Sequence, residues 1–185
     1  MKNINDYIVT FGGVMTDALC DAILAEYKNS EDWIPAITAA GKSDAQRQCE
    51  TIGISFNSII EKNPKVRAKL DKYIFASAGL AIKKYKEKFP LAEIQEDSGY
   101  DLLRYTEGQF YTTHTDSFKD RPRAVSCSFV LNNDYKGGEF AFFDRELIYK
   151  LKKGDALIFP SNFMYPHEIM PVTSGTRYSI VTWFV

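Results

Sequence analysis

A helical pattern of apolar side chains lies near the start of the chain. Leu19, Ile23 and Tyr27 recur every four residues, so they would share one side of a helix. Thr16 precedes them, and its hydroxyl oxygen is of the kind that accepts a hydrogen bond from the first turn of a helix. The pattern therefore predicts an amphipathic helix over residues 16–27.

A second and longer helix is predicted between Asn63 and about Lys88. Asn63 is a favourable cap residue, Pro64 follows at the first helical position, and Phe89-Pro90 ends the pattern. The basic run 83–88 is expected to face water, because lysines near a helix C-terminus favour the helix dipole. The apolar side is predicted to carry Val66, Leu70, Tyr73, Ile74, Ser77 and Ala81.

The rest of the chain lacks this helical period. Residues 29–50 are polar and interrupted by Pro35 and Gly41, which is typical of a long loop that serves as a lid or binding loop. Residues 47–56 are expected to turn into a strand. After residue 98, short apolar or alternating segments separated by turn residues predict antiparallel strands over 100–105, 124–132, 139–143, 155–160 and 176–185.

This order of elements predicts an α+β, mainly β fold. Short strands at regular spacing after N-terminal helices suggest a sandwich or jelly roll with the helices packed on one sheet. The length of 185 residues fits a single domain over 1–185. Helical support would occupy about 14–90, and the β core about 98–185.

Charge and cysteine content narrow the class of protein. The formal net charge of −1 predicts neither a nucleic-acid-binding surface nor a basic membrane-binding surface. Cys20, Cys49 and Cys127 are odd in number and widely separated, so they suggest neither disulfides nor a zinc site; Cys127 is expected to be a small core residue. With no apolar leader or membrane-spanning run in the sequence, we expect a cytoplasmic protein without a membrane partner.

The two histidines of the chain suggest a metal site. His114 precedes Asp116 by two residues, so both side chains would project to one face if residues 113–116 are extended. His167 would arrive from another strand or its approach. Two histidines and one carboxylate leave open positions on an octahedral metal and are typical of non-haem Fe(II) oxygenases, whereas structural zinc usually takes four protein ligands. The pattern favours iron.

Arg177 lies ten residues beyond His167 on a predicted strand. A guanidinium buried in a barrel needs an anionic partner, and a carboxylate matches its planar fork. A dicarboxylate cosubstrate would satisfy it. Taken alone, however, Arg177 could equally form a salt bridge at the edge of a strand.

These segments resemble the Fe(II)/2-oxoglutarate-dependent dioxygenases, specifically the prolyl 4-hydroxylase-like branch. Residues 105–116, YTEGQFYTTHTD, are similar to that branch's Y-x-x-G-x-x-Y-x-x-H-x-D, and the segments 137–142, 152–162 and 167–184 are similar to its later blocks in the same order. The resemblance covers roughly residues 98–185. It implies a double-stranded β-helix, which is the jelly roll expected above.

The resemblance also implies roles for individual residues. His114, Asp116 and His167 would bind Fe(II), and Arg177 would take the distal carboxylate of 2-oxoglutarate, which is converted to succinate and CO2 as O2 is consumed. Ascorbate is a candidate reductant. Residues at the family's positions around the cosubstrate and metal, any of which could instead be packing, are Tyr105, Tyr111, Ser179 and Trp183.

The subfamily and the substrate remain open on sequence grounds. Collagen-type enzymes usually have lysine at the place of Arg177, whereas oxygen-sensing prolyl hydroxylases have arginine there and a tyrosine near the place of Val130. Arg47, Arg121 and Arg123 could line a substrate entrance or simply face water. The expected function is hydroxylation of a prolyl residue in a peptide or protein. The alternatives are the same chemistry on a free amino acid, another small metabolite or an alkylated nucleobase, and a jelly-roll binding or sensing module without turnover.

Overall fold

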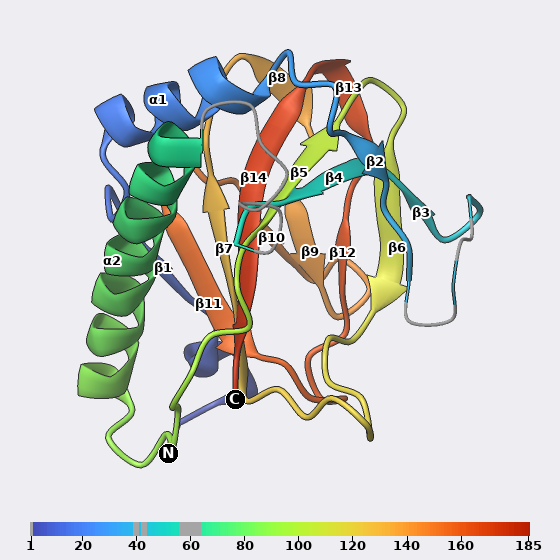
Figure 1. The fold of residues 1–185 in the computed structure, drawn as a ribbon. Helices are drawn as coiled ribbons and strands as arrows, with labels where there is room; N and C mark the ends of the chain where they lie inside the picture. The colour runs from blue at the N-terminus through green and yellow to red at the C-terminus, as the bar shows by residue number, and fades with distance from the viewer. Residues whose placement is uncertain (1, 39–40, 42–43, 56–63) are drawn as a thin grey trace.

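The computed structural model describes residues 2–38, 41, 44–55 and 64–185 (Figure 1). Two helices lie beside a core of antiparallel strands. In chain order the elements are η1 (Ile4–Tyr7), β1 (Val9–Phe11), α1 (Asp17–Tyr27), β2 (Ile34–Pro35), β3 (Arg47–Gln48), β4 (Glu50–Gly53), α2 (Pro64–Lys88), β5 (Asp101–Tyr105), β6 (Phe110–His114), β7 (Val125–Val130), β8 (Tyr135–Gly137), β9 (Phe140–Phe142), β10 (Leu147–Tyr149), β11 (Ala156–Pro160), β12 (His167–Ile169), β13 (Val172–Gly175) and β14 (Arg177–Phe184).

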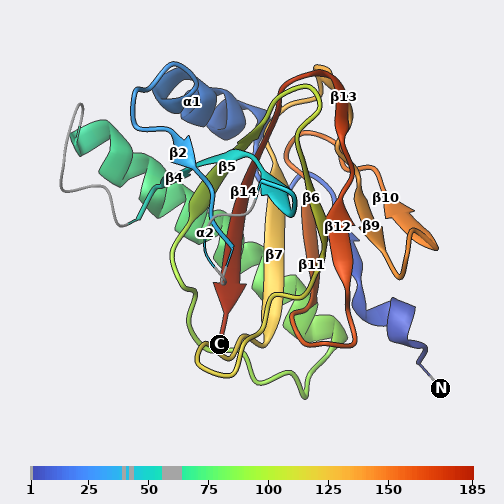
Figure 2. The same cartoon turned by 90° about the vertical axis from the view of Figure 1, so that its right-hand side faces the viewer.

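The strands form two facing sheets. The larger has the order β1-β11-β7-β14-β5-β4-β2, and the smaller has the order β10-β9-β12-β6-β3. All pairings within them are antiparallel, and Figure 2 shows β7 and β14 on one side with β6 and β12 on the other. A two-stranded sheet of β13 and β8 lies beside them. The predicted jelly roll with helices on one sheet is confirmed.

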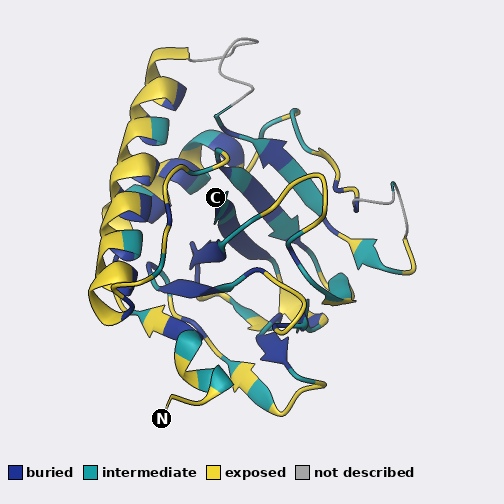
Figure 3. Cartoon of the chain, turned by 90° about the horizontal axis from the view of Figure 1, so that it is seen from below, coloured by how far each residue is buried: buried dark blue, intermediate teal, exposed yellow. Residues whose placement is uncertain are grey.

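Both helices cover the outer face of the larger sheet. The hydroxyl of Thr16 accepts a hydrogen bond from the backbone N–H of Leu19, as expected of a helix cap. Ile23 on α1 and Ile74 on α2 are fully buried in one core with residues of β7 and β14, including Cys127, whose predicted place in the core is confirmed. Figure 3 shows buried positions between the layers and exposed positions along the outer side of α2, including the lysines of 83–88.

The predicted apolar side of α2 is wrong at two positions. Val66 is 47% exposed and Tyr73 is 51% exposed, while Arg67 is buried. The buried stripe is shifted because the guanidinium of Arg67 pairs with Glu26 and Asp32 and so can enter the interface with α1. The predicted cap Asn63 lies outside the described residues. Buried positions on α2 are Arg67, Leu70, Ile74, Ser77, Ala78, Ala81 and Tyr85.

Polar side chains lie on the inner faces of the two sheets. Side chains alternate along a strand, so Arg177, Ser179 and Trp183 on β14 share one face, which points into the space between the sheets. On the paired strand β5, Tyr105 lies opposite Arg177. In the part of the chain that the structure describes, none of the helices combines the length and apolar character that a membrane span requires.

Candidate active site

His114 and His167 meet across neighbouring strands of the smaller sheet. Their Cα atoms are direct partners in the pairing of β6 with β12. The Nε2 atom of each ring lies 3.5 Å from a different carboxylate oxygen of Asp116. The candidate ligand atoms of the three residues all lie within 4.8 Å of one another, so one metal ion could contact all three.

The backbone conformation at Asp116 differs from the extended strand that the sequence predicted. Strand β6 ends at His114, so Asp116 sits in a bend just beyond the strand and not on an extended segment. Its position comes from the following loop, where the backbone N–H of Asp116 donates to the carbonyl oxygen of Ser161. The predicted convergence of the two side chains is present, but strand alternation does not produce it.

Hydrogen bonds to the backbone orient both imidazole rings. The Nδ1 atom of His114 lies 2.8 Å from the carbonyl oxygen of Thr112, and that of His167 lies 3.1 Å from the carbonyl oxygen of Tyr165. A carbonyl can only accept, so each Nδ1 carries a proton, and in the neutral form of each ring the lone pair is on Nε2, the atom next to Asp116. Such fixing of the ring is typical of metal-binding histidines.

Asp116 is held as a carboxylate. The hydroxyl of Ser126 donates to one of its oxygens over 2.6 Å, and Ser126 in turn contacts the hydroxyl of Ser161. Burial alone would raise the pKa of the Asp116 carboxyl, but the two histidines and the Ser126 hydrogen bond outweigh burial and hold that pKa well below its ordinary value.

His167 is held neutral. Burial lowers the pKa of its imidazole to about 4, against the opposing attraction of Asp116. At neutral pH the buried set therefore combines a carboxylate with a neutral imidazole, which are the protonation states that a divalent metal requires.

These residues open into a cavity of about 740 Å³ between the two sheets. The cavity wall includes all eleven site residues predicted from the sequence, so the structure brings them together. Exposed residues form its rim, which we define as Ile37, Phe118, Asp120 and Arg121. The predicted residues in the wall are Arg47, Tyr105, Tyr111, His114, Asp116, Arg121, Arg123, His167, Arg177, Ser179 and Trp183.

The inner end of the cavity holds unsatisfied donors. Arg177 is 1% exposed, and one of its terminal nitrogens donates to the hydroxyl of Ser179 over 2.7 Å. Among the described residues, the Nε–H of Arg177 has no hydrogen-bond partner, and the buried hydroxyl of Tyr105 has no oxygen or nitrogen partner. A buried guanidinium without a protein carboxylate fits an anionic ligand, and a carboxylate could accept from both groups.

A glycine makes room for this guanidinium. Gly138 has φ +69°, and a Cβ atom built on it would lie 2.8 Å from Cδ of Arg177. The guanidinium is also flanked by the rings of Tyr105 and Phe140, each with its centroid 5.5 Å away. The position of Arg177 therefore depends on close backbone approach as well as on its hydrogen bond.

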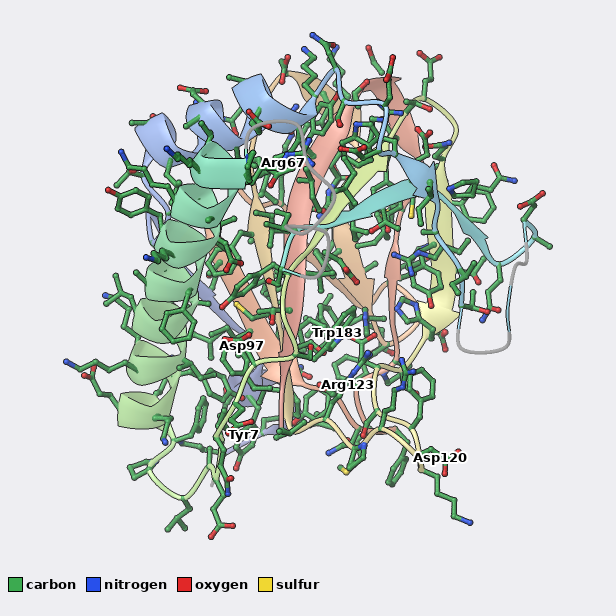
Figure 4. The ribbon with its side chains drawn as sticks, in the orientation of Figure 1. Tyr7, Arg67, Asp97, Asp120, Arg123 and Trp183 are labelled. Carbon is green, nitrogen blue, oxygen red and sulfur yellow. The ribbon has the colours of Figure 1, made fainter. Side chains whose placement is uncertain are left out.

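Aromatic and basic side chains surround the outer part of the cavity. The ring of Tyr111 stacks on that of His114 with centroids 3.5 Å apart, and the guanidinium of Arg47 lies 4.6 Å from the Tyr111 ring. The guanidinium of Arg123 lies 3.7 Å from the centroid of Trp183, and Figure 4 shows this pair near one end of β14. Arg47 and Arg123 therefore belong to the cavity wall and are not merely solvated surface residues.

Sequence reasoning missed polar residues of the inner face, among them Ser126 and Asp101. Ser126 orients Asp116, and Asp101 lies at the start of β5 on the same face as Tyr105. Both have a weak signal in the sequence, because each is a polar residue at a position of an apolar strand whose alternation points inward.

Comparison with known proteins places the second half of the chain in a family. Residues 100–185 match the 2OG-Fe(II) oxygenase superfamily. A PKHD-type hydroxylase of Idiomarina loihiensis is 34% identical over 88 residues, which are 44% of this chain and 39% of that protein. The chain therefore matches only about two fifths of that relative's length.

Two solved structures share the fold over nearly the whole chain. A prolyl hydroxylase from Trichoplax adhaerens, in complex with a hypoxia inducible factor oxygen degradation domain peptide fragment, has a TM-score of 0.78 at 17% identity; the match covers 96% of this chain and 83% of that one. A prolyl-4-hydroxylase of Pseudomonas putida has a TM-score of 0.72 at 21% identity, covering 96% and 91%.

Proposed function

Because the chain belongs to the 2OG-Fe(II) oxygenase superfamily through residues 100–185, we propose that it is an Fe(II)- and 2-oxoglutarate-dependent dioxygenase that hydroxylates a prolyl residue in a peptide or protein. One observation carries the proposal: a two-histidine, one-carboxylate set and a buried arginine without a carboxylate partner among the described residues share one cavity. The first fits Fe(II), and the second fits the cosubstrate.

His114, Asp116 and His167 would hold the iron, and Arg177 with Ser179 and Tyr105 would hold the distal carboxylate of 2-oxoglutarate. When bound, the metal and cosubstrate supply the oxidising chemistry: 2-oxoglutarate and O2 become succinate and CO2, and one oxygen atom of O2 enters a C–H bond of the substrate as a hydroxyl group. The protein's own contribution is to bind, orient and shield these groups.

The three candidate metal ligands need not transfer a proton to bind the metal. His114 and His167 keep their protons on Nδ1, where backbone carbonyls accept them, and Asp116 stays ionised beside the Ser126 hydroxyl. A carboxylate and imidazole rings protonated only on Nδ1 are the forms that bind a divalent cation. Their second partners fix the direction of each donor atom, which should favour a single metal geometry.

Apolar side chains form part of the cavity wall. Such walls limit competing reactions of an oxidant with solvent and strengthen the pairing of Arg177 with a carboxylate. The apolar wall residues are Leu103, Phe140, Phe159, Ile169 and Val181.

A peptide is the substrate that the outer cavity supports best. Its rim carries exposed apolar side chains, Ile37 at 63% and Phe118 at 39% exposure, next to the basic residue Arg121. A rim of this composition can pack against the residues on either side of a target proline. The peptide held by the Trichoplax adhaerens relative is consistent with this substrate class.

The test is a panel of proline-containing peptides incubated with the protein, Fe(II), 2-oxoglutarate and air, with and without ascorbate. We expect peptide-stimulated succinate formation and a peptide product heavier by one oxygen atom, both absent in the Asp116→Ala variant. Free proline and an alkylated oligonucleotide form the parallel arms. Stimulation by one of these and by none of the peptides would replace the prolyl-peptide assignment, and succinate formation in no arm would contradict the enzyme assignment.

A further inference from the structure

Asp101 is an acidic residue of the cavity that the proposed chemistry does not use. It is the first residue of β5, with its Cα atom opposite that of Val181 on β14. It lies on the same face of β5 as Leu103 and Tyr105, and all three line the cavity. Its half-buried carboxylate therefore faces the interior of the jelly roll and not the helices.

The carboxylate of Asp101 has no partner in the described part of the chain. No described residue donates a hydrogen bond to it or forms an ion pair with it. Burial raises the pKa of this carboxyl, although Arg47 and Arg123 oppose the rise, so burial outweighs the attraction of the two guanidinium groups. A polar group in this state normally has a partner, and one that faces a cavity can obtain it from a ligand.

The two nearest cations are already engaged. Arg47 donates from Nε to the sulfur of Cys49 and from a terminal nitrogen to the carbonyl oxygen of Ile37. Arg123 donates to the backbone carbonyl oxygen of Asp116 and stacks on Trp183. Neither guanidinium forms an ion pair with Asp101, so both attract its carboxylate only from beyond ion-pair distance.

Asp101 is also too far from the inner end of the cavity to serve the cosubstrate. Four residues separate it from Tyr105, which is about 13 Å along a strand. Its end of the cavity is the metal end, because Trp183, two residues beyond Val181, pairs with Ser126, and Ser126 donates to Asp116. Asp101 thus lies toward the metal end of the cavity, on a wall that a substrate bound there could contact.

We propose that Asp101 is a substrate-binding residue, whose carboxylate accepts a hydrogen bond from an N–H group of the substrate next to the reacting residue. This inference rests on the proposed function and deepens it, because it requires a substrate that carries such a donor. The donor is a backbone amide N–H in a peptide. A protonated amine of a free amino acid offers the same chemistry, and the test separates the two sources.

The experiment measures substrate binding without turnover. The protein is loaded anaerobically with Mn(II) and 2-oxoglutarate and titrated by calorimetry with the peptide that gives the largest succinate stimulation, and with free proline. The same titrations use peptides in which single backbone amides are N-methylated. The variants are Asp101→Leu, which removes the acceptor, and Asp101→Asn, which removes the charge but keeps an acceptor oxygen. Glu107→Leu, which removes an exposed acidic side chain in the turn between β5 and β6, outside the cavity wall, is the matched control.

We expect Asp101→Leu to weaken peptide binding by about 10- to 100-fold, the range for a lost hydrogen bond to a charged group. Glu107→Leu should change peptide binding less than about threefold, because Glu107 does not line the cavity. N-methylation of one particular amide should weaken binding to wild type by a similar factor but have little further effect in Asp101→Leu. Asp101→Asn should fall between wild type and leucine if the donor is an amide, and should match leucine if free proline is the better ligand and the donor is an ammonium.

Equal peptide affinity in wild type and Asp101→Leu, or no amide whose methylation depends on Asp101, would overturn the inference. Failure of the proposed function looks different, because then no peptide or free amino acid stimulates succinate formation by wild type. Unchanged binding of 2-oxoglutarate to Asp101→Leu and an unchanged urea unfolding curve exclude a general loss of fold.

Discussion

Replacing Arg177 with methionine should weaken 2-oxoglutarate binding without weakening the fold. The guanidinium is 1% exposed, and among the described residues its Nε–H has no partner. Its hydrogen bond to Ser179 and its contacts with the rings of Tyr105 and Phe140 stabilise the folded protein by about 1.5–3 kcal/mol and about 0.5–1 kcal/mol per ring. Burying a charge without a counter-ion costs several kcal/mol, so the two effects nearly cancel.

Methionine keeps most of the packing volume and removes the charge. We therefore expect the unfolding free energy of the cosubstrate-free Arg177→Met protein to be at most about 1 kcal/mol below that of wild type. Loss of one partner of a buried charge pair should cost about 2–5 kcal/mol of cosubstrate binding, a factor of roughly 30 to several thousand. Arg177→Lys retains the charge without the planar fork and should fall between the two.

The assays are calorimetric titration of 2-oxoglutarate into the Mn(II)-loaded protein without oxygen, and urea unfolding of the metal-free protein. A 2-oxoglutarate affinity of Arg177→Met within threefold of wild type would refute the assignment of the guanidinium to the cosubstrate. A loss of more than about 3 kcal/mol in unfolding free energy would show instead that Arg177 serves the fold.

Three further outcomes are expected. Gly138→Ala should weaken 2-oxoglutarate binding at least tenfold and leave Mn(II) affinity unchanged, because the added methyl group would lie 2.8 Å from Cδ of Arg177; calorimetry measures both, and unchanged cosubstrate affinity would contradict this. Asp116→Ala should abolish turnover while retaining the far-ultraviolet circular dichroism of wild type, and wild-type succinate formation in this variant would exclude Asp116 as a ligand. The metal-free protein should lose about 1.5 kcal/mol of unfolding free energy between pH 6.5 and 5, because the pKa of His167 is about 4 when folded and the unfolded chain takes up this proton at higher pH. Urea unfolding at both pH values checks this, and His167→Gln should flatten the dependence.

The longer elements and the site residues could be predicted from the sequence because their signals are local. The period of apolar residues and the capping hydroxyl of Thr16 define α1, and alternation defines β5, β7 and β14. The short strands β1, β8, β10 and β13 were not predicted, because three or four residues carry too little alternation and form strands only through their partners.

Tertiary partners decided the remaining differences. Arg67 is buried in place of Val66 because Glu26 and Asp32, which are distant in the sequence, form ion pairs with it. The local period of apolar residues in α2 cannot predict these partners. Asp116 is placed by a hydrogen bond to Ser161, which lies 45 residues away in the sequence. The sequence pattern thus indicated the candidate ligand types, and the fold brings their side chains within reach of one another.

The most direct test of the iron and cosubstrate site is an anaerobic titration with Fe(II) followed by 2-oxoglutarate, observed in the visible range. Wild type should bind one Fe(II) per chain and develop a metal-to-ligand charge-transfer band on addition of 2-oxoglutarate, and His114→Ala should remain folded without the band. A wild-type protein that is folded but shows no band, or a His114→Ala variant that retains it, would contradict the assignment of His114, Asp116 and His167 as the iron site.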